Sequence, residues 1–232
     1  MCSDIARIDP RGASFPRLND GPEGVLIRLT VSDEAPDATA IARAVEVLRA
    51  GGLVAFPTDT LYGIAADPTS DRAVDKLFRI KGRDARSAIP LIAADEGQAR
   101  AAGAFGERET RLARRFWPGP LSIVVRAMPG LSRAVVGADE TIAIRVPAQS
   151  VARALARAFG FCITATSANR SGASAAASAD AVVDMLPGLD LLLDSGPARG
   201  GPPSTIVAFD ADGPVLIRAG AVAWDRVLKS CR

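Results

Sequence analysis

The chain has 232 residues, with 28 lysines and arginines against 26 aspartates and glutamates, a formal net charge of +2, and it contains no histidine. The absence of histidine excludes Ser-His-Asp and Cys-His nucleophiles, histidine-ligated zinc, and the side chain that most often acts as a general base near neutral pH. A composition that is 48% hydrophobic and 23% charged is that of an ordinary globular protein, and this length supports one large core.

Charge and cysteine usage indicate the compartment. A net charge of +2 is too small to indicate a general binder of nucleic acid or membranes. Cys2 and Cys231 lie near the two ends and Cys162 lies in an apolar run, so the cysteines predict neither a metal quartet nor a disulfide framework. No stretch approaches the roughly 18 apolar residues that a membrane span needs, and the first residues do not resemble a signal peptide. We therefore expect a soluble, cytoplasmic protein.

Periodicity and turn residues predict the elements in chain order. Residues 1–23 are polar and rich in proline and glycine, which predicts a poorly ordered leader before a single domain over residues 24–232. Apolar residues alternate over 25–31, as in a strand, and the next helix begins after Asp37 as its N-cap and ends at Gly51. Further helices are expected near 71–81, 95–102, 107–116, 148–159, 179–186 and 221–229, and further strands at 53–56, 89–93, 121–126, 142–146, 161–166, 190–194, 205–209 and 214–218.

The order of these elements predicts the fold class. Helices alternate with single strands in the first part of the chain, whereas the last strands follow one another directly. This order favours an α+β fold in which helices cover the faces of a mixed sheet. The sequence shows no internal repeat and no linker of the kind that separates domains.

Polar side chains follow the buried strand 53–56. Thr58, Asp59 and Thr60 come directly after it, at what would be the carboxyl edge of a sheet, where open α/β sheets bind ligands. Two hydroxyls and a carboxylate could hold a small polar substrate. The alternative is a turn in which Thr58 and Asp59 hydrogen-bond only to the backbone.

A basic cluster surrounds the end of the helix 71–81. Residues 71–86 contain six lysines and arginines and three aspartates, and Lys81 and Arg83 flank a glycine at the helix end. A phosphate site is one interpretation of this cluster. Cations at a helix C-terminus also stabilise the helix dipole, and a basic helix end is more often a cap than a ligand site. We expect Lys81 to be an exposed helix-end cation whose substitution affects activity more than folding.

Three loops could also contact an anion. The segment 167–172 follows the strand 161–166 with hydroxyl, amide and glycine residues, and glycine lets backbone N–H groups approach a phosphate. The second segment, 200–205, leads into the next strand, and the third is Arg218 to Gly220. Each of these could be an ordinary loop. No P-loop and no G-x-G-x-x-G fingerprint appears, so a nucleotide would need a different cradle.

Taken together, seven short motifs occur in an ordered series between about residues 38 and 222. The motifs are PTDTLYG (57–63), KGR (81–83), WPGPL (117–121), RVP (145–147), SANRSG (167–172), STI (204–206) and RAG (218–220). The series closely resembles the YrdC/TsaC family, in its single-domain form. That resemblance implies a three-layer α+β fold, with helices flanking a twisted mixed β-sheet.

The resemblance also implies an activity, that of an L-threonylcarbamoyladenylate synthase, which is a nucleotidyltransferase. Such an enzyme converts L-threonine, bicarbonate or CO2, and ATP into threonylcarbamoyl-AMP and pyrophosphate. The product serves the t6A modification of tRNA, which separate downstream transferase machinery completes. Mg²⁺ arrives with ATP and is held through the phosphates, so no metal site on the protein is expected.

Residue roles carry over by position in the motifs. One departure is the segment 84–89, which lacks the proline and asparagine that the family usually has there, so the closure of this loop over a nucleotide is left open. The implied threonine contacts are Thr58, Thr60, Arg145 and Ser204. The implied nucleotide contacts are Lys81, Arg83, Thr141, Ser167, Asn169 and Arg218, and Lys81 and Arg83 are the implied catalytic residues.

Two other classes of function remain open. The basic helix and loops could form a module that binds RNA weakly, with nucleotide binding incidental. A carbamoyl-transfer domain of a hydrogenase-maturation system has a similar fold, but such domains sit in much longer chains. The implied synthase chemistry needs no histidine, because a carbamate oxygen attacks the α-phosphate directly and the site has only to position the reactants and neutralise charge.

Overall fold

The computed structural model describes residues 26–82, 88–137, 139–172, 176–198 and 200–231. The predicted leader, 1–23, lies outside the described residues, as do Arg83 and the segment 84–87. The boundary between the leader and the domain over residues 24–232 therefore stays a prediction. Among the described residues, every helix is too short or too polar to cross a membrane.

The strands form two mixed sheets where we expected one. The first sheet contains parallel and antiparallel pairs, in the order β1 (Ile27–Thr30), β10 (Leu191–Asp194), β2 (Val54–Pro57), β3 (Tyr62–Ala65) and β9 (Thr166–Ser167). The second sheet has the order β12 (Pro214–Arg218), β11 (Thr205–Phe209), β6 (Leu121–Ala127), β7 (Thr141–Arg145), β4 (Leu91–Ile92) and β8 (Ile163–Thr164), and β5 (Gly103–Ala104) pairs with β6.

The predicted strand 161–166 is divided between the two sheets. Its first part pairs with β4 as β8, and the chain then passes into the first sheet as β9 beside β3. The Thr164 backbone N–H donates to the Ala66 carbonyl at 3.2 Å, so the two sheets meet at this point. A single apolar run thus contributes one strand to each of the two sheets. Periodicity along the sequence does not reveal this division.

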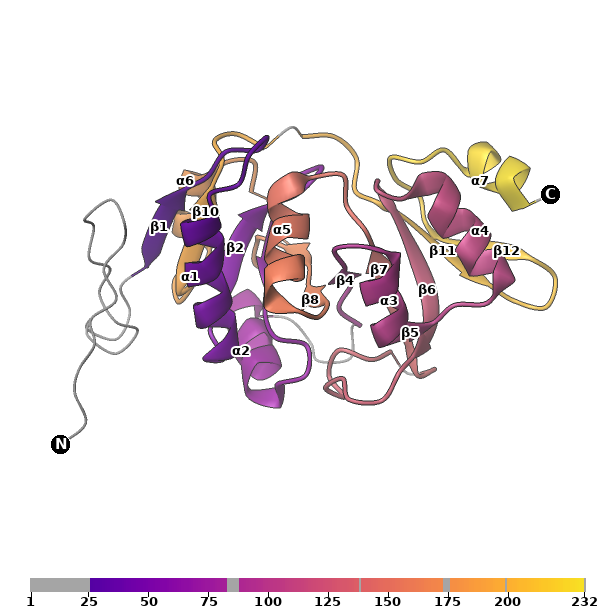
Figure 1. The fold of residues 1–232 in the computed structure, drawn as a ribbon, viewed down its shortest axis with the longest axis horizontal. Helices are drawn as coiled ribbons and strands as arrows, with labels where there is room; N and C mark the ends of the chain where they lie inside the picture. The colour runs from indigo at the N-terminus through magenta and orange to yellow at the C-terminus, as the bar shows by residue number, and fades with distance from the viewer. Residues whose placement is uncertain (1–25, 83–87, 138, 173–175, 199, 232) are drawn as a thin grey trace.

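Helices cover both faces of the first sheet (Figure 1). Helices α1 (Ala38–Arg49) and α5 (Ser150–Phe159) pack against Val54 and Phe56 of β2 in one core cluster. Ala55, which points to the opposite face, belongs to a second and larger cluster together with α2 (Asp71–Lys81) and α6 (Ala179–Met185). The result is the three-layer α+β arrangement that the resemblance implied.

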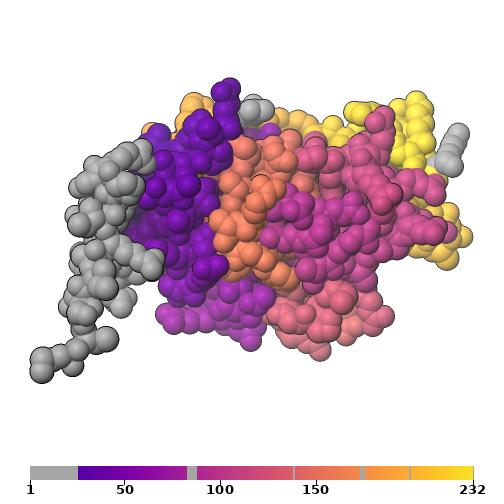
Figure 2. Space-filling view, viewed as in Figure 1, coloured from indigo at the N-terminus to yellow at the C-terminus, as the bar shows by residue number. Residues whose placement is uncertain are grey.

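The remaining helices pack beside the second sheet and complete the larger cluster. They are α3 (Glu96–Ala102), α4 (Glu107–Phe116) and α7 (Trp224–Cys231). In Figure 2 the packed elements form one elongated body, with the C-terminal segment at the end opposite β1.

Most predicted elements are confirmed within a few residues. The Asp37 carboxylate caps α1 by accepting from the Thr39 and Ala40 N–H groups at 2.8 and 2.9 Å, and Gly51 adopts a φ of 80° after the helix. Strand β3 was missed. All four of its residues are buried, so it shows no alternation, and its second residue is glycine, which disfavours strands.

Candidate functional site

One face of the second sheet is open, and several of the candidate residues lie on it or beside it. Along β7, Ile142 and Ile144 are buried in the larger core, whereas Thr141 and Ala143 on the other face are partly exposed. The same alternation holds on β11, where Val207 is buried and Ile206 is half-buried. Because alternate residues of a strand share a face, this open side also carries Arg145 at the end of β7.

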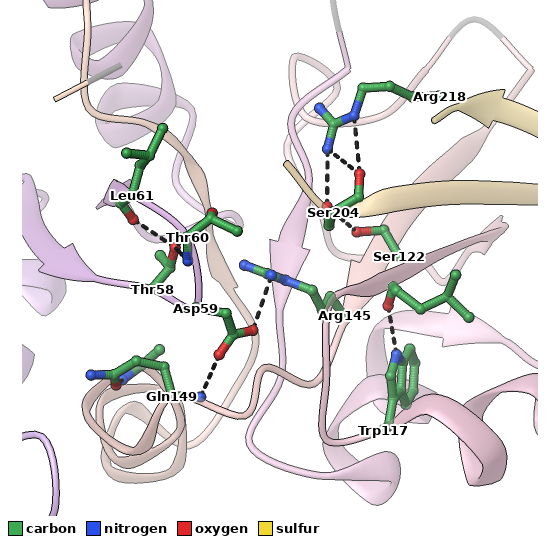
Figure 3. A network of polar contacts seen from close by, with 12 residues as sticks. Thr58, Asp59, Thr60, Leu61, Trp117, Ser122, Arg145, Gln149, Ser204 and Arg218 are labelled. Carbon is green, nitrogen blue, oxygen red and sulfur yellow. Dashed lines mark hydrogen bonds and ion pairs between the residues drawn. The ribbon is translucent and has the colours of Figure 1, made fainter. Parts of the chain in front are cut away.

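Arg145 forms a buried ion pair with Asp59 (Figure 3). Its Nη1 lies 3.1 Å from Asp59 Oδ2, and the two side chains are only 9% and 11% exposed. The second carboxylate oxygen, Oδ1, accepts the backbone N–H of Gln149 at 2.6 Å. The carboxylate therefore joins the turn after β2 to the end of β7 and to the start of α5. Arg145 is therefore paired with a carboxylate far away in the sequence, whereas its near neighbour Glu140 pairs with Arg126 and Arg133.

The Arg145 guanidinium also interacts electrostatically with Arg218. Burial lowers the pKa of Arg145 from its ordinary value, the Asp59 carboxylate opposes that shift, and the positive charge of Arg218 adds to it. Burial likewise lowers the pKa of Arg218. Arginine keeps its proton even when its pKa falls. Two positively charged guanidinium groups, one from β7 and one from β12, therefore lie in the same region of the site.

Hydroxyl groups lie on the neighbouring turn. Thr58 Oγ1 donates to the Leu61 carbonyl at 2.6 Å, and it lies 3.4 Å from Thr60 Oγ1. It also accepts the Thr60 N–H at 3.3 Å. Thr58 is therefore used within the turn, as the alternative predicted, but the alternative is wrong for Asp59, whose carboxylate pairs with Arg145. The Thr60 side chain is only half-buried. Thr60 is the better placed of the two to meet a ligand.

Ser204 and Arg218 form the opposite rim (Figure 3). Arg218 Nε and Nη2 donate to the Ser204 carbonyl at 3.1 and 2.7 Å, and Nη2 also donates to its hydroxyl at 2.9 Å. The Ser204 hydroxyl lies 3.1 Å from that of Ser122 on β6. An added Cβ on Gly220 would collide with the backbone of Pro203 and Ser204, which explains the glycine two residues after Arg218.

Lys81 is buried, so the expectation of an exposed helix-end cation is wrong. Its side chain reaches back from the last turn of α2, and the residue is 3% exposed. Its ammonium donates to the Asn169 carbonyl at 2.8 Å and to the Ser167 carbonyl. Lys81 is the last residue of α2, and Gly82 caps the helix with a φ of 56°. Lys81 therefore fixes the turn that follows β9.

The other expected nucleotide contacts are spread more widely. Ser167 and Asn169 lie on the turn that Lys81 holds, and the Ser167 hydroxyl donates to Asn169 Oδ1 at 2.5 Å. Thr141 shares the open face with Arg145 but begins β7 where Arg145 ends it, about 13 Å away at the usual rise per residue. Arg83 lies outside the described residues.

Two residues of the motifs, Tyr62 and Trp117, make hydrogen bonds within the protein. The motifs alone do not distinguish such structural residues from residues that contact a ligand. The Tyr62 hydroxyl, fully buried, donates to the Gly196 carbonyl at 2.7 Å and accepts from the Ser195 N–H at 3.2 Å. Trp117 Nε1 donates to the Leu121 carbonyl at 2.7 Å and so closes the turn into β6 (Figure 3). Both side chains stabilise the loops that carry the site.

Sequence reasoning missed the part that Asp59 and Gln149 play. Asp59 lies 86 positions from Arg145 in the chain, so no local pattern links them. The Gln149 side chain caps α5 by accepting from the Ala152 N–H at 3.1 Å and donates to Asp33 at 2.7 Å. The only available signal was the acidic residue within the PTDT segment. Within the described part of the chain, no three acidic or cysteine side chains are grouped as metal ligands would be.

The fold and the site together define a class: an α+β protein whose open sheet face and rims carry two arginines, a buried carboxylate and hydroxyls, an arrangement chemically suited to a small anionic ligand. The chain belongs to the Sua5/YciO/YrdC family, described as Telomere recombination, which matches residues 46–220. The family resemblance drawn from the motifs is thereby confirmed.

Two curated relatives of this chain carry the same name, threonylcarbamoyl-AMP synthase. A threonylcarbamoyl-AMP synthase of Bacillus subtilis (strain 168) is 37% identical over 190 residues, 81% of this chain and 55% of the relative. One of Pyrococcus abyssi is 36% identical over 184 residues, 78% of this chain and 54% of the relative. The chain thus spans about half the length of these two curated relatives.

A solved structure shares the fold. The crystal structure of P. abyssi Sua5 complexed with L-threonine is similar with a TM-score of 0.82 and 33% identity, over 89% of this chain and 60% of that one. The similarity confirms the three-layer α+β class.

Proposed function

We propose that this chain makes threonylcarbamoyl-AMP from L-threonine, bicarbonate and ATP, as a nucleotidyltransferase that supplies t6A modification of tRNA. The observation that carries the proposal is the pair of cationic forks, Arg145 and Arg218, on one open sheet face beside threonine and serine hydroxyls. Support also comes from the relatives named threonylcarbamoyl-AMP synthase and from the L-threonine complex of the similar P. abyssi protein.

In this proposal Arg145 binds the carboxylate of threonine. Asp59 occupies Nη1, which leaves donors of the planar guanidinium for a second carboxylate. The Thr60 and Ser204 hydroxyls lie on the two rims and would contact the rest of the amino acid. Arg218 and the turn of Ser167 and Asn169 would contact the nucleotide. Lys81 would act through the position of that turn.

The reaction then needs positioning and charge neutralisation. Threonine and bicarbonate give the N-carboxylate with loss of one water and one proton. A carbamate oxygen forms a bond to the α-phosphorus of ATP, and the bond from that phosphorus to the bridging oxygen breaks as pyrophosphate leaves. Mg²⁺ enters as part of the substrate MgATP and neutralises the leaving phosphates. No step requires histidine, in keeping with the composition.

The purified protein should release pyrophosphate from MgATP only when threonine and bicarbonate are both present. Threonylcarbamoyl-AMP should accumulate in equal amount and can be identified by mass spectrometry. Serine and 3-hydroxybutanoate serve as matched controls, because they remove the methyl group and the amine in turn. Equal pyrophosphate release without threonine would exclude the proposed activity.

Arg145→Lys should raise the KM for threonine by about 10-fold to 150-fold, with a much smaller change in the KM for ATP. Lysine keeps the charge but cannot form the bidentate fork, and a hydrogen bond to a charged group contributes about 1.5–3 kcal/mol. Steady-state kinetics with each substrate varied in turn measure the effect. The same kinetics are measured for Ser204→Ala, a variant on the opposite rim of the site, for comparison. An unchanged threonine KM with a lower melting temperature would show that Arg145 only stabilises the fold.

A further inference from the structure

Helices α4 and α7 lie side by side at the end of the molecule opposite β1 (Figure 1). Side chains of both helices line a basic groove there. We use the name basic groove for the surface formed by five cations, with Phe116 and Ser230 beside them. Its volume is about 620 Å³, within the range of ordinary ligand sites. The five cations are Arg111, Arg114, Arg115, Arg226 and Lys229.

The groove concentrates positive charge in a protein that is nearly neutral. Together α4 and α7 contain six lysines and arginines and three acidic residues, so their balance of 6 − 3 = +3 exceeds that of the whole chain, +2. Lys229 pairs with Asp225 at 3.6 Å, with both side chains largely exposed. Among the described residues, no carboxylate pairs with Arg111, Arg114 or Arg115.

Helix capping explains only part of this arrangement. Arg114 and Arg115 lie in the last turn of α4, where cations interact favourably with the helix dipole. Arg226, however, is the third residue of α7, near the end of the helix where a cation is unfavourable. Arg111 also lies three and four residues before Arg114 and Arg115, at spacings where like charges repel. These unfavourable placements indicate an anionic partner.

The ring of Phe116 fixes one of these cations. The Arg226 Cζ atom lies 5.8 Å from the ring centroid, a cation–π contact between the two helices. A guanidinium held against an aromatic ring still has its other face free to stack. Unpaired RNA bases stack on arginine planes and on aromatic rings, while arginine forks bind phosphate oxygens.

We propose that the basic groove binds a single-stranded segment of RNA, with its phosphates on Arg111, Arg114 and Arg115 and a base on Arg226. An acidic protein segment would match the charge but would not use the stacking surface. This proposal does not depend on the synthase activity. It also moves RNA contact away from the helix 71–81, where Lys81 is buried and Lys76 pairs with Asp190 at 2.6 Å.

The test measures the binding of a fluorescein-labelled 12-nucleotide RNA of mixed sequence to the full chain by anisotropy, at several KCl concentrations. The double variant Arg114→Gln/Arg115→Gln should weaken binding by about 10-fold or more. It should also reduce the slope of log Kd against log salt by about 1.4, because each lost phosphate contact removes about 0.7. Arg226→Lys should weaken binding several-fold with an unchanged salt slope, since it keeps the charge but loses the planar group.

The matched control is Arg72→Gln/Arg79→Gln, which removes the same charge from exposed positions on α2. It should change Kd by less than about two-fold. An equal loss of binding in this control would overturn the proposal, because binding would then follow overall charge. Displacement of the RNA by polyglutamate at equal charge concentration would also overturn it, in favour of an acidic protein partner. Threonylcarbamoyl-AMP synthesis and the melting temperature should be unchanged in the groove variants, which separates this result from a failure of the proposed function.

Discussion

Lys81→Met should lower the free energy of unfolding by about 3 kcal/mol or more. Methionine preserves the apolar stem of the buried side chain but removes the ammonium that donates to the Ser167 and Asn169 carbonyls. Each hydrogen bond to a charged donor contributes about 1.5–3 kcal/mol, and buried carbonyls left without a donor are destabilising. Urea denaturation followed by circular dichroism measures the loss.

Lys76→Met is the matched control on the same helix. Lys76 pairs with Asp190, but these two side chains are 31% and 35% exposed, so its substitution should cost about 1 kcal/mol or less. Activity per folded molecule should fall in Lys81→Met and not in Lys76→Met, because only Lys81 positions the turn after β9. Similar small losses of stability in both variants would mean that the Lys81 ammonium does not hold this turn.

The Asp59 and Arg145 pair should show strong energetic coupling. Either single substitution, Asp59→Asn or Arg145→Met, leaves the partner's charge buried without compensation and should lower stability by about 3–5 kcal/mol. The double variant should lose less than the sum of the two, by at least about 1 kcal/mol. Asparagine retains an oxygen for the Gln149 N–H, so the comparison isolates the charge.

The control cycle uses Arg126 and Glu140, an exposed pair 3.3 Å apart with side chains 74% and 58% exposed. Its coupling should stay below about 1 kcal/mol, because solvent screens exposed charges. Additive losses for Asp59 and Arg145 would show that the two charges are stabilised independently. In that case the Asp59 carboxylate would not be what holds Arg145 in place.

The sequence alone predicted the elements with strong local signals. Asp37 and Gly51 bound α1 because capping and left-handed glycine depend on a few neighbouring residues. The motif series also led to the right family and the α+β class. The candidate residues Arg145, Thr60, Ser204 and Arg218 were all identified from motifs. The structure places Arg145 on one open sheet face, with Thr60 on one rim and Ser204 and Arg218 on the other.

Only the tertiary structure decided how distant segments meet. The ion pair of Asp59 with Arg145 spans 86 positions, and the passage of the strand 161–166 between two sheets depends on pairing with β4 and β3. Lys81 was expected at the surface because helix-end lysines usually reach solvent, yet packing against the turn after β9 encloses it. Pairing and burial depend on which surfaces meet in space, and the physical signals along a single sequence are local.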